Sequence, residues 1–188
     1  MHGLVCFDCD STLSGIEGID ELARMRGPEV FAEVEAMTRA AMEGGTPLDE
    51  VFAKRLDLIR PTRAELDRLA EMYLAQVEPT ARECIEQLEH HGWYCAIVSG
   101  GFAHAILPLA VSLGIEHVEA VPLTFDDAGA YVDFDRSFPA TRRGGKNEIL
   151  RDLRARMKPR KVVMVGDGAS DLETQPDADL FVGYGGFV

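Results

Sequence analysis

The sequence predicts an α/β protein with a doubly wound, mainly parallel sheet and a small helical unit inserted after the first strand. A buried strand is expected at residues 4–8, because residues 4–7 form a short apolar run directly before Asp8. Residues 15–78 carry helical periodicity instead of a second strand, and strands and helices alternate after Pro79. We therefore expect residues 1–14 and 79–188 to form the α/β core and residues 15–78 to form the helical insert.

The first strand leads directly into two carboxylates, Asp8 and Asp10, followed by the hydroxyls of Ser11 and Thr12. Alternate residues of an extended chain point the same way, so Asp8 and Asp10 are expected to converge on one ligand. Two such carboxylates need a shared proton or a cation, and an Mg²⁺-like ion is the simplest partner. One carboxylate could then serve as nucleophile and the other as general acid. The simpler alternative is that both cap a helix.

The helical insert carries recognisable start signals. Thr46 before Pro47 matches an N-cap and first helical residue, and Thr62 with Glu65 matches a capping box. The helix after Thr62 is expected to bury one face. That face consists of Leu66, Leu69, Ala70, Tyr73, Leu74 and Val77.

The segment after Pro79 alternates between the two periodicities. Thr80 with Glu83 matches a second capping box, and Asp-Asp-Ala-Gly at residues 126–129 is a hairpin-type turn. The predicted elements are a helix over 80–91, a strand over 93–98, a helix over 102–113, and a hairpin of residues 118–125 and 130–134.

Three further clusters stand where strands end and helices begin. They are Ser99-Gly100-Gly101, Gly144-Gly145-Lys146, and Gly166-Asp167-Gly168-Ala169-Ser170-Asp171. Glycines let backbone N–H groups approach an anion, and the carboxyl ends of strands in a doubly wound sheet share one crevice. Each cluster alone also reads as an ordinary turn or a surface lysine. Their ordered combination with Asp8 and Asp10 favours a phosphoryl-transfer site.

Composition limits the possible partners. The chain has 188 residues, 46% hydrophobic and 27% charged, with a formal net charge of -13. This charge disfavours binding to nucleic acid or an anionic membrane. No apolar segment approaches the roughly 20 residues of a membrane span, and the first strand begins without a signal peptide. We expect a cytoplasmic protein, monomeric or homodimeric, with a small-molecule substrate.

The cysteine pattern Cys6-x-x-Cys9 has no matching second pair, because Cys84 and Cys95 are widely separated. Residues three apart on a strand face opposite sides, which disfavours a disulfide or a zinc site. Reduced, mostly buried thiols are expected.

These motifs resemble the haloacid dehalogenase-like phosphatases, whose pattern runs Asp-x-Asp-x-Thr, then Ser or Thr, then Lys, then Gly-Asp-x-x-x-Asp. The matching residues are Asp8, Asp10, Thr12, Ser99, Lys146, Gly166, Asp167 and Asp171. Longer segments, such as Glu-Gly-Ile-Asp-Glu-Leu-Ala and Val-Ser-Gly-Gly-Phe, are similar to the phosphoserine phosphatase branch. The resemblance covers nearly the whole chain. It implies a Rossmann-like core and a mobile helical cap over the active site.

The resemblance also implies roles for individual residues. Asp8 would attack phosphorus to form an aspartyl phosphate, and Asp10 would protonate the leaving alkoxide and then activate water. Mg²⁺ would be held by the Asp8 carboxylate, the Asp10 backbone carbonyl and Asp167. Phosphoryl oxygens would be bound by Ser99, Gly100 and Lys146. Supporting positions would be Thr12, Ser170 and Asp171.

The choice of substrate is expected to depend on the insert. In phosphoserine phosphatases a glutamate binds the substrate ammonium and an arginine binds its carboxylate, and the matching positions are Glu17 and Arg55. Met42 and Leu48 match an apolar part of the pocket. Without the resemblance, Glu17 suits a first helical turn and Arg55 a solvent-facing helix position. The implied reaction is hydrolysis of O-phospho-L-serine to L-serine and phosphate, a step of L-serine biosynthesis.

Two other functions stay open on the sequence. A relative could hydrolyse another small phosphomonoester or pass the phosphoryl group to an acceptor such as homoserine. A non-catalytic phospho-acceptor module would use a similar set of residues, although Asp10 and the large insert argue against it. Two positions depart from the family pattern. Ser170 stands where relatives often have Asn or Thr, and the sequence stops where relatives usually add a short strand and helix, so an uncovered sheet edge is expected.

Overall fold

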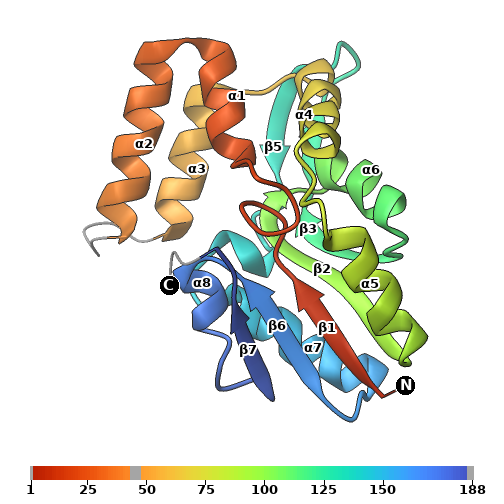
Figure 1. Ribbon diagram of the computed structural model, residues 1–188. Helices are drawn as coiled ribbons and strands as arrows, with labels where there is room; N and C mark the ends of the chain where they lie inside the picture. Colours follow the sequence, from red (N-terminus) through yellow and green to blue (C-terminus); the bar gives the residue numbers. More distant parts are fainter. Residues whose placement is uncertain (1, 43–47, 186–188) are drawn as a thin grey trace.

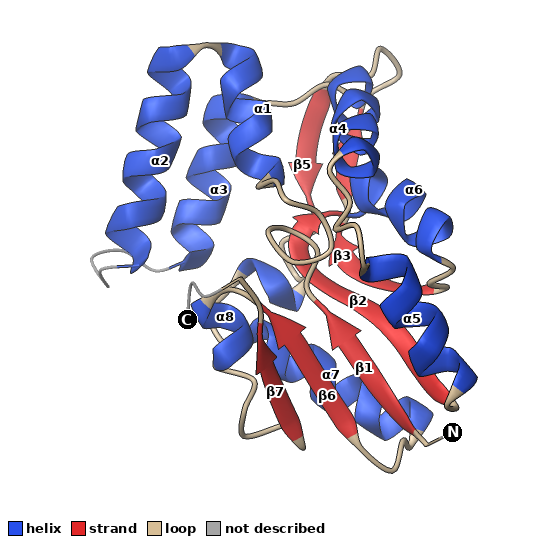
Figure 2. Ribbon diagram, in the orientation of Figure 1, coloured by secondary structure: helices blue, strands red, loops and turns tan. Residues whose placement is uncertain are grey.

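The computed structural model describes residues 2–42 and 48–185, excluding the side chains of residues 41, 42, 48 and 49. A five-stranded parallel sheet forms its centre (Figure 2). In spatial order the strands are β3 (His117–Val121), β2 (Trp93–Phe102), β1 (Gly3–Phe7), β6 (Val162–Gly166) and β7 (Leu180–Gly183). The predicted α/β fold with a doubly wound parallel sheet is confirmed.

Both faces of the sheet are covered by helices, as the apolar runs predicted. Leu4 and Cys6 of β1 belong to a core with α7 (Gly145–Met157). Val5 and Phe7 point to the other face, into a larger core. On that face lie α5 (Ala81–His90) and α6 (Ala103–Leu113) (Figure 1).

The strand order reverses at β1, and this reversal positions the site. From β1 the chain builds β2 and β3 on one side, and it later returns to build β6 and β7 on the other. β1 therefore pairs with both β2 and β6. In such sheets the crevice lies beyond the carboxyl ends of the strands at the point of reversal.

The predicted hairpin is present, but its first arm is split. β3 ends at Val121, Pro122 interrupts the run, and β4 (Leu123–Phe125) then pairs antiparallel with β5 (Tyr131–Phe134). A proline lacks the N–H that a continuous strand would use for pairing. The short helix η1 (Pro139–Thr141) follows and leads into α7.

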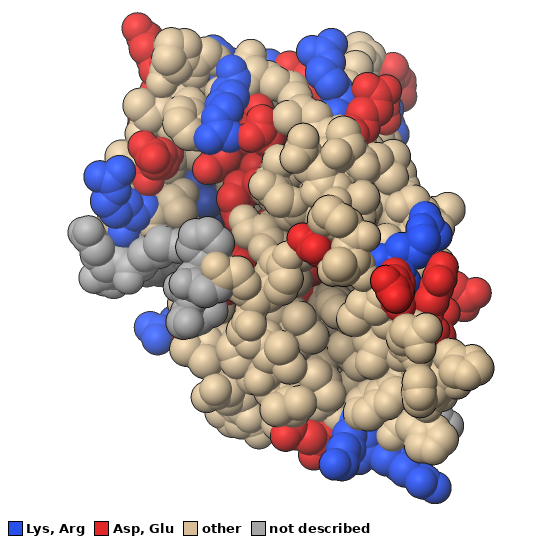
Figure 3. Space-filling model, viewed as in Figure 1, with Lys and Arg blue, Asp and Glu red and all other residues tan. Residues whose placement is uncertain are grey.

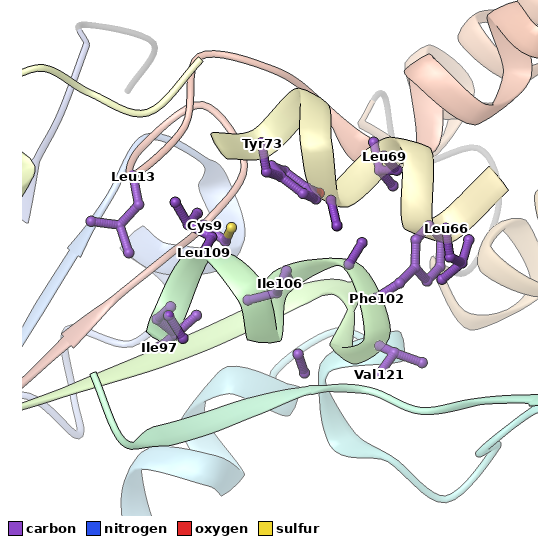
Figure 4. Close-up of a cluster of buried hydrophobic side chains, with 14 of the residues drawn as sticks. Cys9, Leu13, Leu66, Leu69, Tyr73, Ile97, Phe102, Ile106, Leu109 and Val121 are labelled. Atoms are coloured by element: carbon purple, nitrogen blue, oxygen red, sulfur yellow. The ribbon is translucent and has the colours of Figure 1, made fainter. Parts of the chain in front are cut away.

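The insert contains α1 (Gly18–Arg26), α2 (Pro28–Met42), α3 (Leu48–Ile59) and α4 (Arg63–Ala75). Helices α1, α2 and α3 stand together as a group, whereas α4 lies beside α6 (Figure 1). Figure 4 shows why: Leu66, Leu69 and Tyr73 of α4 share an apolar cluster with Ile106 and Leu109 of α6. The division at residues 15–78 stays a prediction.

One of the predicted capping boxes is present and one is wrong. The Thr62 hydroxyl accepts a hydrogen bond from Glu65 N, and the Glu65 carboxylate accepts one from Thr62 N. Thr80 instead has helical backbone angles, and its hydroxyl donates to the Glu78 carboxylate at 3.0 Å. A side chain cannot cap a helix when its own backbone is already helical. The predicted start at Thr46 lies outside the described residues.

The remaining sequence expectations concern surface and thiols. The thiols of Cys6 and Cys95 are buried, and burial raises the pKa of each to about 12.

On the face drawn in Figure 3, Lys and Arg side chains stand among Asp and Glu side chains. No helix within the described residues has the length and apolar character needed to cross a bilayer. Leu180 and Val182 are exposed on β7, the last strand of the sheet order.

Candidate active site

Four segments that are distant in the sequence bring polar side chains to the carboxyl end of β1. Asp8 directly follows β1, and Asp167 directly follows β6. Ser99 lies near the end of β2, and Lys146 lies in the first turn of α7. Asp8, Ser99 and Lys146 are all buried although they are polar. Buried polar groups need partners, and here Asp8 and Lys146 pair with each other while Ser99 Oγ accepts a hydrogen bond from Gly101 N.

Lys146 is the central cation of the site. Its Nζ lies 3.0 Å from Asp8 Oδ1 and 2.6 Å from Asp171 Oδ1. Burial alone would lower the pKa of Lys146, but the charges of Asp8 and Asp171 outweigh burial and raise it. Lys146 is therefore charged at neutral pH and offers a buried positive charge to an anionic ligand.

Asp8, Asp167 and Asp171 form a compact carboxylate cluster, with oxygens that lie within 4.8 Å of one another. Burial, followed by the charge of Asp8, raises the pKa of Asp167. Burial likewise raises the pKa of Asp171 to about 7. Carboxylates gathered in this way are ligands that a hard divalent cation prefers, so the cluster could hold a metal ion.

Asp171 and Asp167 differ in how many hydrogen bonds their carboxylates already accept. Asp171 already uses both oxygens, because Oδ1 accepts from Lys146 and Oδ2 accepts from Gly168 N at 3.1 Å. Its carboxylate also packs directly over Gly166, where a side chain would overlap it at 2.3 Å. Asp167 accepts one hydrogen bond from the Thr12 hydroxyl at 3.1 Å. Asp8 and Asp167 thus suit direct coordination and Asp171 suits a supporting role, and these roles, which the family resemblance implies, stay predictions.

Asp10 does not lie on a strand, because β1 ends at Phe7 and Asp8 to Asp10 belong to the following loop. We expected Asp8 and Asp10 to point the same way because alternate residues of a strand do so. This premise is wrong, because the two residues do not lie on a strand. Asp10 Oδ1 accepts hydrogen bonds from Gly18 N at 3.0 Å and from the Tyr73 hydroxyl. Burial, with the charge of Asp8, raises the pKa of Asp10 to about 6.

The end of β2 offers donors for an anion. Ser99 is fully buried, and its oxygen accepts a hydrogen bond from Gly101 N at 2.9 Å. That bond uses a lone pair of the serine and leaves its O–H available to donate. Gly100 follows directly and is partly exposed. Ser99 and Gly100 thus lie near the carboxyl end of β2, and their predicted role in binding phosphoryl oxygens stays a prediction.

Glu17 directly precedes α1, at the end of the loop that follows β1. Its carboxylate accepts a hydrogen bond from Ser11 Oγ at 2.5 Å. Partial burial, followed by the charge of Asp10, raises the pKa of Glu17 to about 8. A cationic ligand placed beside it would favour its charged form.

Arg55 lies on α3 and is buried, contrary to a solvent-facing position. Its Nη1 donates to the Thr38 hydroxyl at 3.1 Å, whereas its buried Nε has no partner within the described residues. Burial lowers the pKa of Arg55, while Asp20 and Glu17 act in the opposite direction. A buried guanidinium with unused donors suits a carboxylate ligand.

Three other positions, Ser170, Met42 and Leu48, were predicted to contribute to the site. Ser170 is exposed in α8 (Ala169–Leu172). Met42 ends α2 and Leu48 begins α3, and the side chains of both lie outside the described part.

The structure adds two residues that sequence reasoning missed. Cys9 N donates to Asp8 Oδ1 at 2.8 Å, a contact that only the loop conformation reveals. Tyr73 was assigned to the apolar face of a helix, and its ring does lie in the core, but its hydroxyl reaches Asp10. A signal was present, because a buried tyrosine normally needs a partner for its O–H.

A model of the haloacid dehalogenase-like hydrolase family matches residues 5–174. The chain therefore belongs to the haloacid dehalogenase-like hydrolases, as its motifs indicated. Within this family it is similar to phosphoserine phosphatases. The mouse phosphoserine phosphatase is 40% identical over 98% of this chain and 82% of the mouse protein. The phosphoserine phosphatase of Methanocaldococcus jannaschii is 33% identical over 96% of this chain and 84% of that protein.

Solved structures give the same result. A phosphoserine phosphohydrolase-like protein from Francisella tularensis superimposes with a TM-score of 0.84 and 25% identity, covering 97% of this chain and 87% of that one. A phospho-aspartyl intermediate analogue of phosphoserine phosphatase superimposes with a TM-score of 0.77 and 29% identity, covering 96% and 92%.

Proposed function

We propose that this protein is a phosphoserine phosphatase that hydrolyses O-phospho-L-serine to L-serine and inorganic phosphate with the help of Mg²⁺. The observation that carries the proposal is the buried pair of Asp8 and Lys146 beside the carboxylate cluster, in a chain about 40% identical to phosphoserine phosphatases over nearly its whole length.

The first step uses Asp8 as the nucleophile. Oδ1 of Asp8 is engaged by Cys9 N and Lys146, which fixes the carboxylate and leaves its other oxygen to act as the nucleophile. That oxygen forms a bond to phosphorus while the bond between phosphorus and the serine oxygen breaks. Asp10 gives its proton to the departing serine oxygen, so that L-serine leaves as a neutral alcohol.

The second step releases phosphate. Asp10, now ionised, takes a proton from water while the water oxygen attacks phosphorus. The bond between phosphorus and the Asp8 oxygen breaks, and both aspartates return to their initial state. A pKa of about 6 at Asp10 supports both roles, because a general acid that must later act as a base works best when its pKa is near the working pH.

The phosphoryl group would be surrounded by positive charge and by donors. Lys146, Ser99 and the backbone of Gly100 would bind its oxygens at the end of β2 and the start of α7. A bound Mg²⁺ would be held by the Asp8 carboxylate, the Asp10 carbonyl and Asp167, and it would neutralise charge on the phosphoryl oxygens. In phosphoryl transfer such positioning and charge stabilisation supply almost all of the catalysis.

Recognition of the amino acid would fall to Glu17, for the ammonium, and to Arg55, for the carboxylate. Met42 would contribute apolar contact. We infer that the group of α1, α2 and α3 is the cap, because Glu17 directly precedes α1 while Met42 and Arg55 lie on α2 and α3, whereas α4 packs mainly on α6 of the core.

The proposal is tested by phosphate release from O-phospho-L-serine over many turnovers, with Mg²⁺ present or chelated and with homoserine added. Release of one serine and one phosphate per cycle, dependent on Mg²⁺, is expected. Appearance of phosphohomoserine would make the protein a phosphotransferase. A single burst of serine without phosphate release would make it a phospho-acceptor and would overturn the proposal.

A further inference from the structure

One oxygen of the Asp10 carboxylate accepts hydrogen bonds from two donors that lie on different helices. Its Oδ1 accepts from Gly18 N, at the start of α1, and from the hydroxyl of Tyr73, on α4. The Tyr73 residue is fully buried, so its hydroxyl has no access to water. Both donors act on the same oxygen and leave the other oxygen of Asp10 for a different partner.

The second oxygen points toward the end of β2. A side chain built on Gly101 would place its first carbon 2.8 Å from Asp10 Oδ2 and 3.2 Å from Ser99 Oγ. Asp10 Oδ2 therefore lies against Gly101 and close to Ser99, the residue expected to bind the phosphoryl group. Only a glycine leaves space for the carboxylate there.

Tyr73 is itself held firmly. Its ring lies in the apolar cluster between α4 and α6, as Figure 4 shows. Its backbone carbonyl accepts a hydrogen bond from Ser14 Oγ at 3.1 Å, which ties α4 to the loop that carries Asp10. A donor mounted on a packed helix can fix a carboxylate more precisely than water can.

From this geometry we propose that Tyr73 is a positioning residue of the reaction, whose hydroxyl holds Oδ1 of Asp10 so that Oδ2 faces the oxygen of the leaving serine. The inference rests on the proposed function, because it assigns Tyr73 a part in the proton transfer by Asp10. Tyr73 lies outside the set of residues that the family motifs identify.

The competing explanation is that the contact only satisfies a buried hydroxyl. The two explanations differ in their dependence on the leaving group. An alkyl oxygen such as that of serine needs a proton to depart, whereas the phenolate of p-nitrophenyl phosphate leaves readily without one. A general acid contributes about 10²- to 10⁴-fold only where the proton is needed.

The test compares Tyr73→Phe with Tyr131→Phe, a matched control. Tyr131 is also buried, on β5, and its hydroxyl has no partner within the described residues. We expect Tyr73→Phe to lower kcat/KM for O-phospho-L-serine by roughly 10-fold and to change that for p-nitrophenyl phosphate by less than about 2-fold. Tyr131→Phe should leave both values unchanged. In an Asp10→Asn background, Tyr73→Phe should have no further effect on phosphoserine.

An equal loss for both substrates, or no loss for either, would overturn the inference. If wild type itself did not hydrolyse phosphoserine, the proposed function would fail instead. A measurement on the wild type covers the case in which Tyr73→Phe does not fold. The Tyr73 hydroxyl proton should give a protected downfield NMR resonance that shifts in Asp10→Asn, and a proton that exchanges too fast to observe would contradict the contact.

Discussion

The ammonium group of Lys146 lies 3.0 Å from Oδ1 of Asp8, and both side chains are buried. The same ammonium group also contacts Asp171, so one buried cation compensates two carboxylates. Such an arrangement is stable only as a unit, because a buried charge without its partner is costly. The Lys146 and Asp8 pair therefore links the stability of the site to its chemistry.

Replacing the cation should destabilise the fold. Without metal, Lys146→Met should lower the free energy of unfolding by about 3 to 5 kcal/mol, because Asp8 and Asp171 then face each other unpaired. Added Mg²⁺ should recover part of this loss. Urea denaturation measures both effects, with the exposed Lys54→Met as control. A loss below about 1 kcal/mol would show that the pair is not buried as described.

The covalent intermediate should form on one residue. After acid quenching during turnover of ³²P-labelled phosphoserine, the label should map to the peptide that contains Asp8. Asp8→Asn should carry no label and should lose roughly 10⁴-fold or more in kcat, because it lacks the nucleophile. Label on Asp10 or Asp167 in the wild type would refute the assignment of the nucleophile.

Arg55 should contribute to recognition of the substrate carboxylate. We expect Arg55→Ala to raise KM for O-phospho-L-serine roughly 10- to 100-fold, as for loss of a charge-assisted contact. KM for phosphoethanolamine, which has the ammonium but no carboxylate, should change far less. The control is Arg39→Ala, an exposed arginine on α2. Equal effects on the two substrates would indicate that Arg55 has only a structural role.

The junction between α1 and α4 should be sensitive to acid. Arg26 binds the Glu65 carboxylate and also donates to the Ile59 carbonyl at 2.6 Å. Its hydrogen bond lowers the pKa of Glu65 to about 2, from an ordinary value near 4.5. Because the folded pKa is depressed, the stabilisation is present above about pH 4.5 and is lost as the pH falls toward 2.

This junction is tested by Glu65→Gln. At pH 7 the substitution should lower the free energy of unfolding by about 2 kcal/mol, and the difference from wild type should shrink steadily below pH 4.5. Glu50→Gln removes an exposed pair and should cost little at either pH. A difference that stayed constant with pH would exclude the ion pair as its cause.

Much of the fold and of the site could be predicted from the sequence, because the predictive signals were local. The apolar run before Asp8, the alternation after Pro79 and the glycine-rich strand ends each follow from short-range rules. The parallel strands then bring Asp8, Ser99 and Asp167 together at the point where the strand order reverses. Motif resemblance supplied the order of these residues.

What could not be predicted depends on contacts between distant segments. The Thr80 hydroxyl had a capping pattern, but the loop conformation turned it toward Glu78. Tyr73 fits an apolar helical face, and only the packing of α4 on α6 shows that its hydroxyl reaches Asp10. The burial of Arg55 likewise depends on how α2 packs against α3. Local patterns do not encode these choices of partner.

The most direct test of the account is the ratio of kcat/KM for O-phospho-L-serine to that for phosphoethanolamine and phospholactate, measured with Mg²⁺ and after chelation. Phosphoethanolamine lacks the carboxylate that Arg55 would bind, and phospholactate lacks the ammonium that Glu17 would bind. The account predicts that kcat/KM for phosphoserine exceeds kcat/KM for either analogue by at least about 10-fold, because each analogue loses one charged contact. It also predicts that chelation of the divalent cation abolishes turnover of all three esters. Equal rates for the three esters, or full activity without a divalent cation, would contradict it.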